Sequence, residues 1–205
     1  MIGEHSITAS NQDPGPASHP DTEQQQVAYH VRKILELLGE NPDRDGLQDT
    51  PVRVAKMFEE MLAGMHVDAT SVLSTTFEET SQGPVIVSDI TFYSLCEHHM
   101  VPFFGKAHVG YLPGKRIIGL SKIARLVDAV SQRLQVQERM THQIVDAMTA
   151  ALHPEGVIAL VEAEHTCMCA RGVKKPGSMT TTIAASGRYQ DDYALRQEFL
   201  RMIGK

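Results

Sequence analysis

The segment 85–99 reads VIVSDITFYSLCEHH and joins a predicted strand to a set of metal-binding side chains. Its first part, Val85 to Tyr93, is rich in β-branched and aromatic residues, which favour a strand. Cys96 and His99 follow with the spacing C-x-x-H, and on a continuous strand they would point to opposite faces. Both can reach one ion only if the backbone turns there. The sequence therefore predicts that the strand ends at Cys96.

His165-Thr166-Cys167 is the second part of the candidate site. Residues two apart on a strand share a face, so a strand continuing through Cys167 would place both side chains in one pocket. Cys167 is then the third ligand, with Cys96 and His99. Three protein ligands leave the fourth position of zinc open, which is the catalytic pattern, whereas a fourth ligand from Cys169 would close it. Ligand softness favours zinc without excluding iron or cobalt.

Length and composition indicate one cytoplasmic domain with N-terminal additions. The chain has 205 residues, a formal net charge of -6 and three cysteines. The acidic balance argues against nucleic-acid binding, and no apolar run approaches the roughly 20 residues of a membrane span. The first residues lack the order of a signal peptide, and an odd number of cysteines is a poor disulfide framework. We expect reduced thiols, no membrane and no nucleic acid.

The domain organisation follows from where apolar periodicity begins. Residues 1–22 are polar and are predicted to form a disordered N-terminal tail. Residues 23–66 are predicted to be a helical extension, with one helix from Val27 that stops at Gly39 and a second that is capped by Thr50. Residues 67–205 form the predicted catalytic domain.

Strands and helices are segregated along that domain, which indicates an α+β fold rather than a doubly wound sheet. A strand at 106–112 is expected to turn at Pro113-Gly114 and pair with 116–120. Ser121 is expected to cap a helix whose buried stripe runs from Ile123 to Leu134. The remaining predictions are a helix with Met140, Ile144, Ala147, Met148 and Ala151 inward, strands at 157–167 and 179–185, and a last helix starting at Asp191-Asp192 with Leu195, Phe199 and Ile203 inward.

Four ordered motifs, CEHH at 96–99, GLSK at 119–122, QVQER at 135–139 and HTCMCARG at 165–172, together resemble the GTP cyclohydrolase I family. The similarity runs from about Asp49 to about residue 187, and four motifs in one order are far more specific than a single C-x-x-H. The resemblance implies a tunnelling fold (T-fold), in which an antiparallel sheet carries two helices on one face and strands form a ring in the oligomer. It also implies a homodecamer of two pentamers with active sites at subunit interfaces.

The resemblance further implies a reaction and its residues. GTP and water would give 7,8-dihydroneopterin triphosphate and formate, the first step of tetrahydrofolate and pterin biosynthesis. Zinc-bound water would attack guanine C8, histidines would transfer protons, and ring opening, formate release, ribose rearrangement and ring closure would follow. The implied roles are zinc ligands, Cys96, His99 and Cys167; catalytic groups, His98, His165 and Ser121; substrate-binding residues, Glu138, Gln137, Lys122, Arg125, Arg171, Arg53 and Lys56, with the last two from a neighbouring subunit.

These residue types suit that chemistry, although several have simpler explanations in isolation. The two oxygens of Glu138 can accept both N1–H and the 2-amino group of guanine, and the cations can bind a triphosphate. Taken alone, Glu138 is a helix-start charge, and Lys122 and Arg125 form a solvated helix face. Two other functions remain open: a nitrile reductase of the same fold, with a cysteine nucleophile and NADPH, and a catalytically inert zinc-bound scaffold.

Overall fold

The structure is a computed structural model of the chain, and it describes residues 22–79 and 83–205. The predicted disordered tail lies outside the described residues, apart from Thr22. The described residues fall into two compact units that divide between Met57 and Phe58.

The first unit contains α1 (Glu23–Leu37) and the start of α2 (Thr50–Met61). Thr22 caps α1 and Gln25 completes a capping box, and Gly39 follows with a φ of +82°, a backbone conformation that favours glycine. Thr50 was predicted to cap α2 but is its first residue, and its hydroxyl donates to the Gly46 carbonyl.

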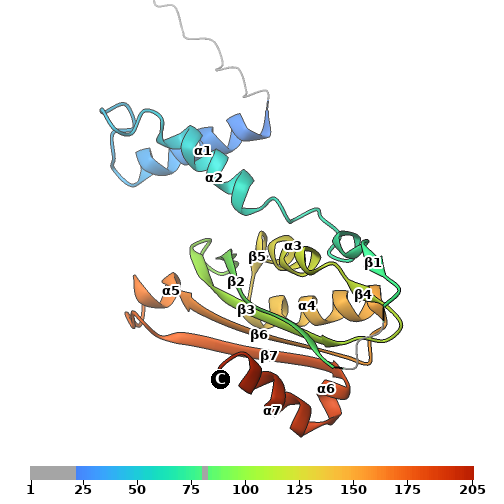
Figure 1. Cartoon of the computed structure of the whole chain (residues 1–205). Helices are drawn as coiled ribbons and strands as arrows, with labels where there is room; N and C mark the ends of the chain where they lie inside the picture. Colours follow the sequence, from blue (N-terminus) through green and yellow to red (C-terminus); the bar gives the residue numbers. More distant parts are fainter. Residues whose placement is uncertain (1–21, 80–82) are drawn as a thin grey trace, which may run out of the picture. The chain divides into compact units, whose positions relative to one another are not determined.

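The second unit is built on a five-stranded sheet with the order β5-β2-β3-β6-β7. All neighbours are antiparallel except β2 and β5, which are parallel. The strands are β2 (Val85–Cys96), β3 (Pro102–Leu112), β5 (Leu134–Gln135), β6 (Gly156–His165) and β7 (Met179–Gly187). Figure 1 shows β2, β3, β6 and β7 as one twisted layer. The predicted α+β class is confirmed.

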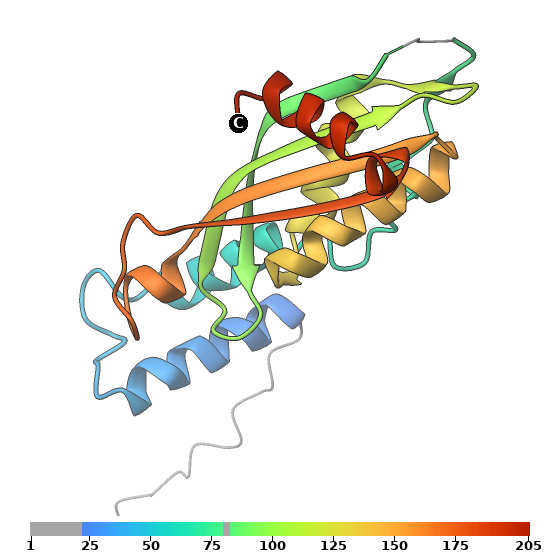
Figure 2. The same cartoon turned by 90° about the horizontal axis from the view of Figure 1, so that it is seen from below.

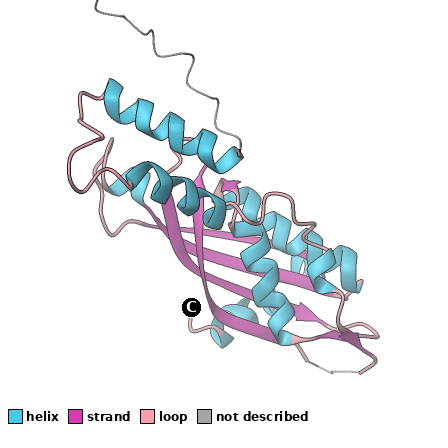
Figure 3. Cartoon of the chain, turned by 90° about the horizontal axis from the view of Figure 1, so that it is seen from above, coloured by secondary structure: helices cyan, strands magenta, loops and turns pink. Residues whose placement is uncertain are grey.

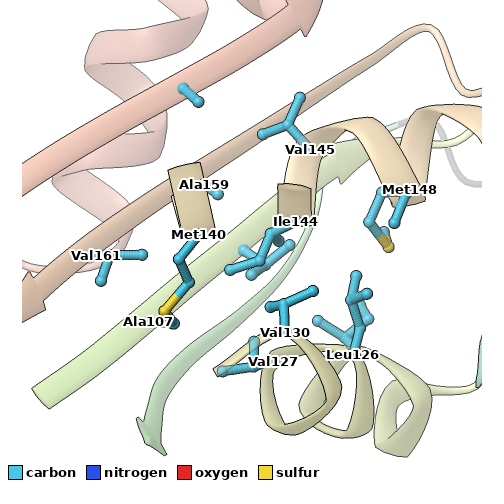
Figure 4. Packing of buried hydrophobic residues seen from close by; sticks show 14 of the residues in the cluster. Ala107, Leu126, Val127, Val130, Met140, Ile144, Val145, Met148, Ala159 and Val161 are labelled. Atoms are coloured by element: carbon cyan, nitrogen blue, oxygen red, sulfur yellow. The ribbon is translucent and has the colours of Figure 1, made fainter. Parts of the chain in front are cut away.

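The alternation of side chains along the strands gives the sheet two buried faces. Helices α3 (Leu120–Ser131) and α4 (Gln137–Leu152) cover one face (Figure 3). Their inward stripes, with Leu126, Val130, Met140 and Ile144, meet strand residues such as Ala107 in an apolar core (Figure 4). These stripes agree with the predicted helical spacing.

The C-terminal helices cover the opposite face of the same sheet (Figure 2). They are α6 (Arg188–Asp191) and α7 (Tyr193–Met202), and Asp192 caps α7 by accepting from the backbone N–H groups of Ala194 and Leu195. Tyr189 and Phe199 pack on Ile158 and Leu160 of β6 in a second apolar cluster, and the predicted inward residues of the last helix belong to it.

Three local predictions in this unit are wrong, each for a physical reason. The segment 116–120 forms only β4 (Ile117–Ile118), which pairs with β1 (Thr76–Phe77), because β3 already has β2 and β6 on its two sides. Ser121 does not cap α3; the helix begins at Leu120, and the cap residue Gly119 has no side chain to accept a hydrogen bond. Leu134 belongs to β5 rather than to the helix stripe.

The remaining elements are short. A 3₁₀ turn at Ser71–Leu73 precedes β1, and the four-residue helix α5 (Thr166–Cys169) follows β6. Among the helices of the described residues, none has the length and apolarity that crossing a membrane requires.

Candidate active site

The turn between β2 and β3 carries the first half of the site. The Cys96 N–H donates to the Val101 carbonyl over 2.9 Å, and the Cys96 carbonyl accepts from Met100 over 2.8 Å. Met100 has a φ of +53°, so the chain reverses direction within this turn. The strand ends at Cys96 as predicted, and the turn brings Cys96 and His99 to the same side.

Cys96, His99 and Cys167 form a group that can hold a metal ion, because one ligand atom from each lies within 4.8 Å of the others. The prediction that Cys167 reaches the group from a strand is wrong. Strand β6 ends at His165 and Cys167 lies on α5, which the Thr166 hydroxyl ties to the start of β3 by donating to the Pro102 carbonyl over 2.5 Å. Burial and the neighbouring Cys96 thiol raise the pKa of Cys167. A bound cation would reverse that effect by stabilising thiolates.

Arg171 contacts one of these candidate ligands. Its Nη1 donates to His99 Nε2 over 2.7 Å, so in this arrangement the proton of a neutral His99 ring is on Nδ1. Binding of a metal through Nδ1 would move that proton to Nε2, and binding through Nε2 would replace the guanidinium directly. Either way, metal binding and this contact of Arg171 exclude each other.

Cys169 is engaged elsewhere. Its thiol donates to Glu164 Oε1 over 3.2 Å and lies 3.7 Å from the Lys175 carbonyl. Burial and the Glu164 carboxylate raise the pKa of this thiol. The group of three candidate ligands therefore does not include the third thiol, and a tetrahedral metal held by it would keep a fourth coordination position open.

Two further histidines flank the group. His98 is exposed on the turn, with Nδ1 3.8 Å from Cys96 Sγ. His165 is half-buried at the end of β6, where its ring stacks on Phe103 with centroids 4.5 Å apart and planes 4° apart. Burial lowers the pKa of His165, opposed by the negative charge of Glu138. A mainly neutral imidazole near pH 7 can accept a proton.

A cavity of about 210 Å³ lies beside the metal-binding group, and most of the predicted site residues at this end of the sheet line it. Glu138 reaches it from the first turn of α4, where its side chain is exposed. The lining residues are Cys96, His98, Gln135, Val136, Gln137, Glu138, His165, Cys167, Met168 and Thr180.

Sequence reasoning missed the residues that support the turn. Arg139 donates to the carboxylate of Glu97, to Gln135 Oε1 over 3.0 Å and to the Leu134 carbonyl over 3.1 Å. The Glu97 N–H in turn donates to the Gln135 carbonyl, and the Arg139 contact lowers the pKa of Glu97. The adjacency of Glu97 to Cys96 and of Arg139 to Glu138 was the only signal in the sequence.

Ser121 and Lys122 lie at the start of α3, at the other end of this unit, and Arg125 lies midway along that helix. The chain leading to them is fixed there by the Ile118 N–H, which donates to the hydroxyl of Tyr111, and Tyr111 faces Val85 at the start of β2. The site lies at the end of β2, which has 12 residues and at about 3.3 Å per residue is roughly 40 Å long. In Figure 1, α3 begins beside β4 at the right and runs toward β5.

Arg53 and Lys56 lie on α2 in the first unit. Arg53 forms an exposed ion pair with Asp49, with 3.1 Å between Nη2 and Oδ2. Their predicted contact with a triphosphate stays a prediction.

The matching family model and three relatives of this chain carry the same enzyme name. The family model for GTP cyclohydrolase I matches residues 27–204. The GTP cyclohydrolase 1 of Streptococcus suis is 52% identical over 183 residues, covering 89% of this chain and 98% of that protein. The same enzyme of Streptococcus pyogenes is 54% identical over 176 residues (85% and 91%), and that of Brevibacillus brevis is 52% identical over 178 residues (86% and 95%).

Among solved structures, the archaeosine synthase QueF-Like in the apo form matches with a TM-score of 0.45 and 18% identity, covering 53% of this chain and 97% of that chain. At this score the likeness carries no conclusion about function. The family model and the relatives, by contrast, extend over most of the chain, including both halves of the metal-binding group. The chain therefore belongs to the GTP cyclohydrolase I family.

Proposed function

We propose that this protein is a zinc-dependent hydrolase that converts GTP and water to 7,8-dihydroneopterin triphosphate and formate. The observation that carries the proposal is the group of Cys96, His99 and Cys167 beside a cavity that also holds His98, His165 and Glu138. Family membership supports the substrate and the reaction.

The donor set fits zinc. Zinc is a borderline-soft ion that accepts thiolate and imidazole ligands, and three protein ligands leave one position for water or substrate. Zinc held there would lower the pKa of water from 15.7 to about 7 and so supply hydroxide at neutral pH.

The histidines are proposed to move protons. Adding hydroxide to C8 of guanine places negative charge on the ring nitrogens, so a proton must be delivered there as the ring opens. His98 is exposed on the turn and His165 is half-buried against Phe103, and both line the cavity. Imidazoles donate and accept near neutrality, which suits successive protonation and deprotonation at nitrogen.

Glu138 is proposed to recognise the guanine base. Its carboxylate stands at the cavity on the first turn of α4, where the helix N-terminus favours negative charge. The two oxygens can accept N1–H and the 2-amino N–H together, a pair of donors that adenine does not present.

The triphosphate and ribose would be bound with the help of a second copy of the chain. Arg171 lies near the metal-binding group, whereas in the same chain Ser121 and Lys122 lie at the far end of the sheet and Arg125 lies midway along α3. If Ser121 and Lys122 act on GTP, they must come from a neighbouring subunit, and Arg125, Arg53 and Lys56 are proposed to do the same. We therefore propose a ring-based homo-oligomer, a decamer of two pentamers, with active sites at subunit interfaces.

The test compares two cysteine variants. Cys167→Ser should lose bound zinc and formate release from GTP together, because it removes a ligand. Cys169→Ser is the matched control, since its hydroxyl can still donate to Glu164, and it should keep both. Undiminished turnover by the Cys167→Ser variant without zinc would refute the proposal.

A further inference from the structure

Gln137 begins α4 and is only 1% exposed, and its side-chain amide is fully engaged within the chain. Its Nε2 donates to the Val161 carbonyl and to the Thr180 carbonyl, each over 2.9 Å, and lies 3.1 Å from the Thr182 hydroxyl. Its Oε1 lies 2.8 Å from His165 Nε2. Neither N–H of the amide is left for a substrate.

The orientation of this amide is determined by its partners. The carbonyls of Val161 and Thr180 can only accept, so the nitrogen must face them. A flipped amide would place its oxygen against two carbonyl oxygens in a buried position, with no compensating hydrogen bond. The oxygen of Gln137 therefore faces His165, and because an amide oxygen only accepts, His165 Nε2 must carry a proton.

His165 is thus held in one plane and one tautomer. The parallel Phe103 ring fixes the plane of the imidazole, and Gln137 fixes the proton on Nε2. In a neutral imidazole with Nε2–H, the only lone pair that can accept a proton is on Nδ1.

We infer that Gln137 is a positioning residue, which accepts from Nε2–H of His165 and so leaves Nδ1 as the ring nitrogen that can act on the substrate. This inference rests on the proposed function, because it assigns His165 its reacting atom. It replaces the predicted role of Gln137 in contacting the guanine base, for which the amide has no free N–H.

The kinetic test uses Gln137→Met, which keeps the length of the side chain and removes the acceptor. Without the acceptor, the wrong tautomer and ring orientations become populated. Loss of a group that orients a metal-ligating imidazole costs about 10- to 100-fold in activity, and we take the same range for an imidazole that moves protons. We expect kcat for formate release to fall by about that factor, with KM for GTP within about threefold of the parent value.

Thr182→Val is the matched control. It removes the Thr182 hydroxyl that lies beside Gln137 Nε2 and Thr141 Oγ1, and it leaves the contact between Gln137 and His165 intact. It should lower thermal stability while kcat stays within about threefold of the parent value. A raised KM with unchanged kcat in Gln137→Met would show contact with the base and overturn the inference. Equal losses of kcat in the two variants would show a merely structural role and overturn it as well.

A spectroscopic measurement keeps the inference testable if Gln137→Met does not fold. Solid-state ¹⁵N spectra of histidine-labelled protein, with His165 assigned from the spectrum of His165→Gln, show which ring nitrogen carries the proton. The expected result is Nε2–H in the parent protein, and in a folded Gln137→Met a mixture of tautomers. A proton on Nδ1 of neutral His165 in the parent overturns the inference. If the parent releases no formate from GTP, the proposed function fails, while this spectrum still tests the tautomer.

Discussion

Replacing Arg139 by Gln tests whether a residue outside the metal-binding group controls its affinity for metal. Arg139 joins the first turn of α4 to the turn that carries Cys96 and His99, by way of Glu97, Gln135 and Leu134. A glutamine at this position keeps a polar group on the helix but is too short to reach all three acceptors.

The magnitude follows from the bonds that would be lost. The ion pair with Glu97 is partly exposed to water, which screens it, so its contribution to stability is small. The hydrogen bonds to Gln135 Oε1 and to the Leu134 carbonyl contribute a net of about 1 kcal/mol each. Two such bonds correspond to at most about 30-fold in an equilibrium constant. Part of this stabilises the fold rather than the turn, so we expect zinc affinity to fall about tenfold, the lower end for groups that support metal ligands.

Zinc affinity can be measured by competition with a chromogenic chelator, on the parent protein, Arg139→Gln and Arg133→Gln. Arg133 is a suitable control because it also donates to two carbonyls, those of Ala129 and Val67, without contacting the metal-binding turn. Its variant should bind zinc within about twofold of the parent. Zinc binding by Arg139→Gln as tight as that of the parent, or an equal loss of affinity in both variants, would refute this role of Arg139.

Three other predictions concern substrate recognition, pH and packing. Glu138→Gln should lower kcat/KM for GTP by about 100-fold or more, because the amide presents a donor where guanine also has one, and an unchanged kcat/KM would exclude the proposed contact. Burial lowers the pKa of His108 below its unfolded value of about 6.5. The charges of Lys205 and Lys106 lower it further, and those of Asp89 and Glu162 oppose the shift. The unfolded chain then binds more protons than the folded chain, so the stability that neutral His108 contributes is complete above about pH 6.5 and is lost as the pH falls toward the lower folded pKa. The fall of Tm between about pH 7.5 and about pH 5.5 should therefore be smaller in His108→Gln than in the parent protein. An equal fall in the two proteins would contradict this. Gly105→Ala should destabilise the fold by about 3 kcal/mol or more in denaturant unfolding, since its Cβ would lie 1.8 Å from the Glu162 carbonyl oxygen, whereas Gly114→Ala, with its nearest contact at 3.2 Å, should cost far less.

The sequence predicted the parts of the fold that depend on local periodicity. The stripes of α3 and α4 and the strand before Cys96 follow from the spacing of apolar residues, which burial against one sheet reinforces. The pairing of 116–120 could not be predicted in this way, because it depends on which sheet edges are already occupied. The break after His165 is likewise non-local, since α5 is tied to β3 through Thr166 and Pro102.

In the candidate site too, features set by local spacing were predicted and features set by contacts between distant segments were not. The C-x-x-H spacing identified the turn and two ligands, and Cys167 joined them although its predicted strand geometry was wrong. The supporting roles of Gln137 and Arg139 arise from contacts between α4, the sheet and the turn, which no spacing within a single segment records. The distance of Ser121 from the cavity also depends on the path of the whole sheet rather than on its motif.

The most direct test of the central claim is to remove the metal with a chelator and then titrate zinc back while formate release from GTP is measured on the same sample. A group with three ligands and one open position predicts that the rate rises in proportion to bound zinc and levels off at about one ion per chain. Full turnover by the metal-free protein would contradict the account, as would zinc binding to saturation without any release of formate.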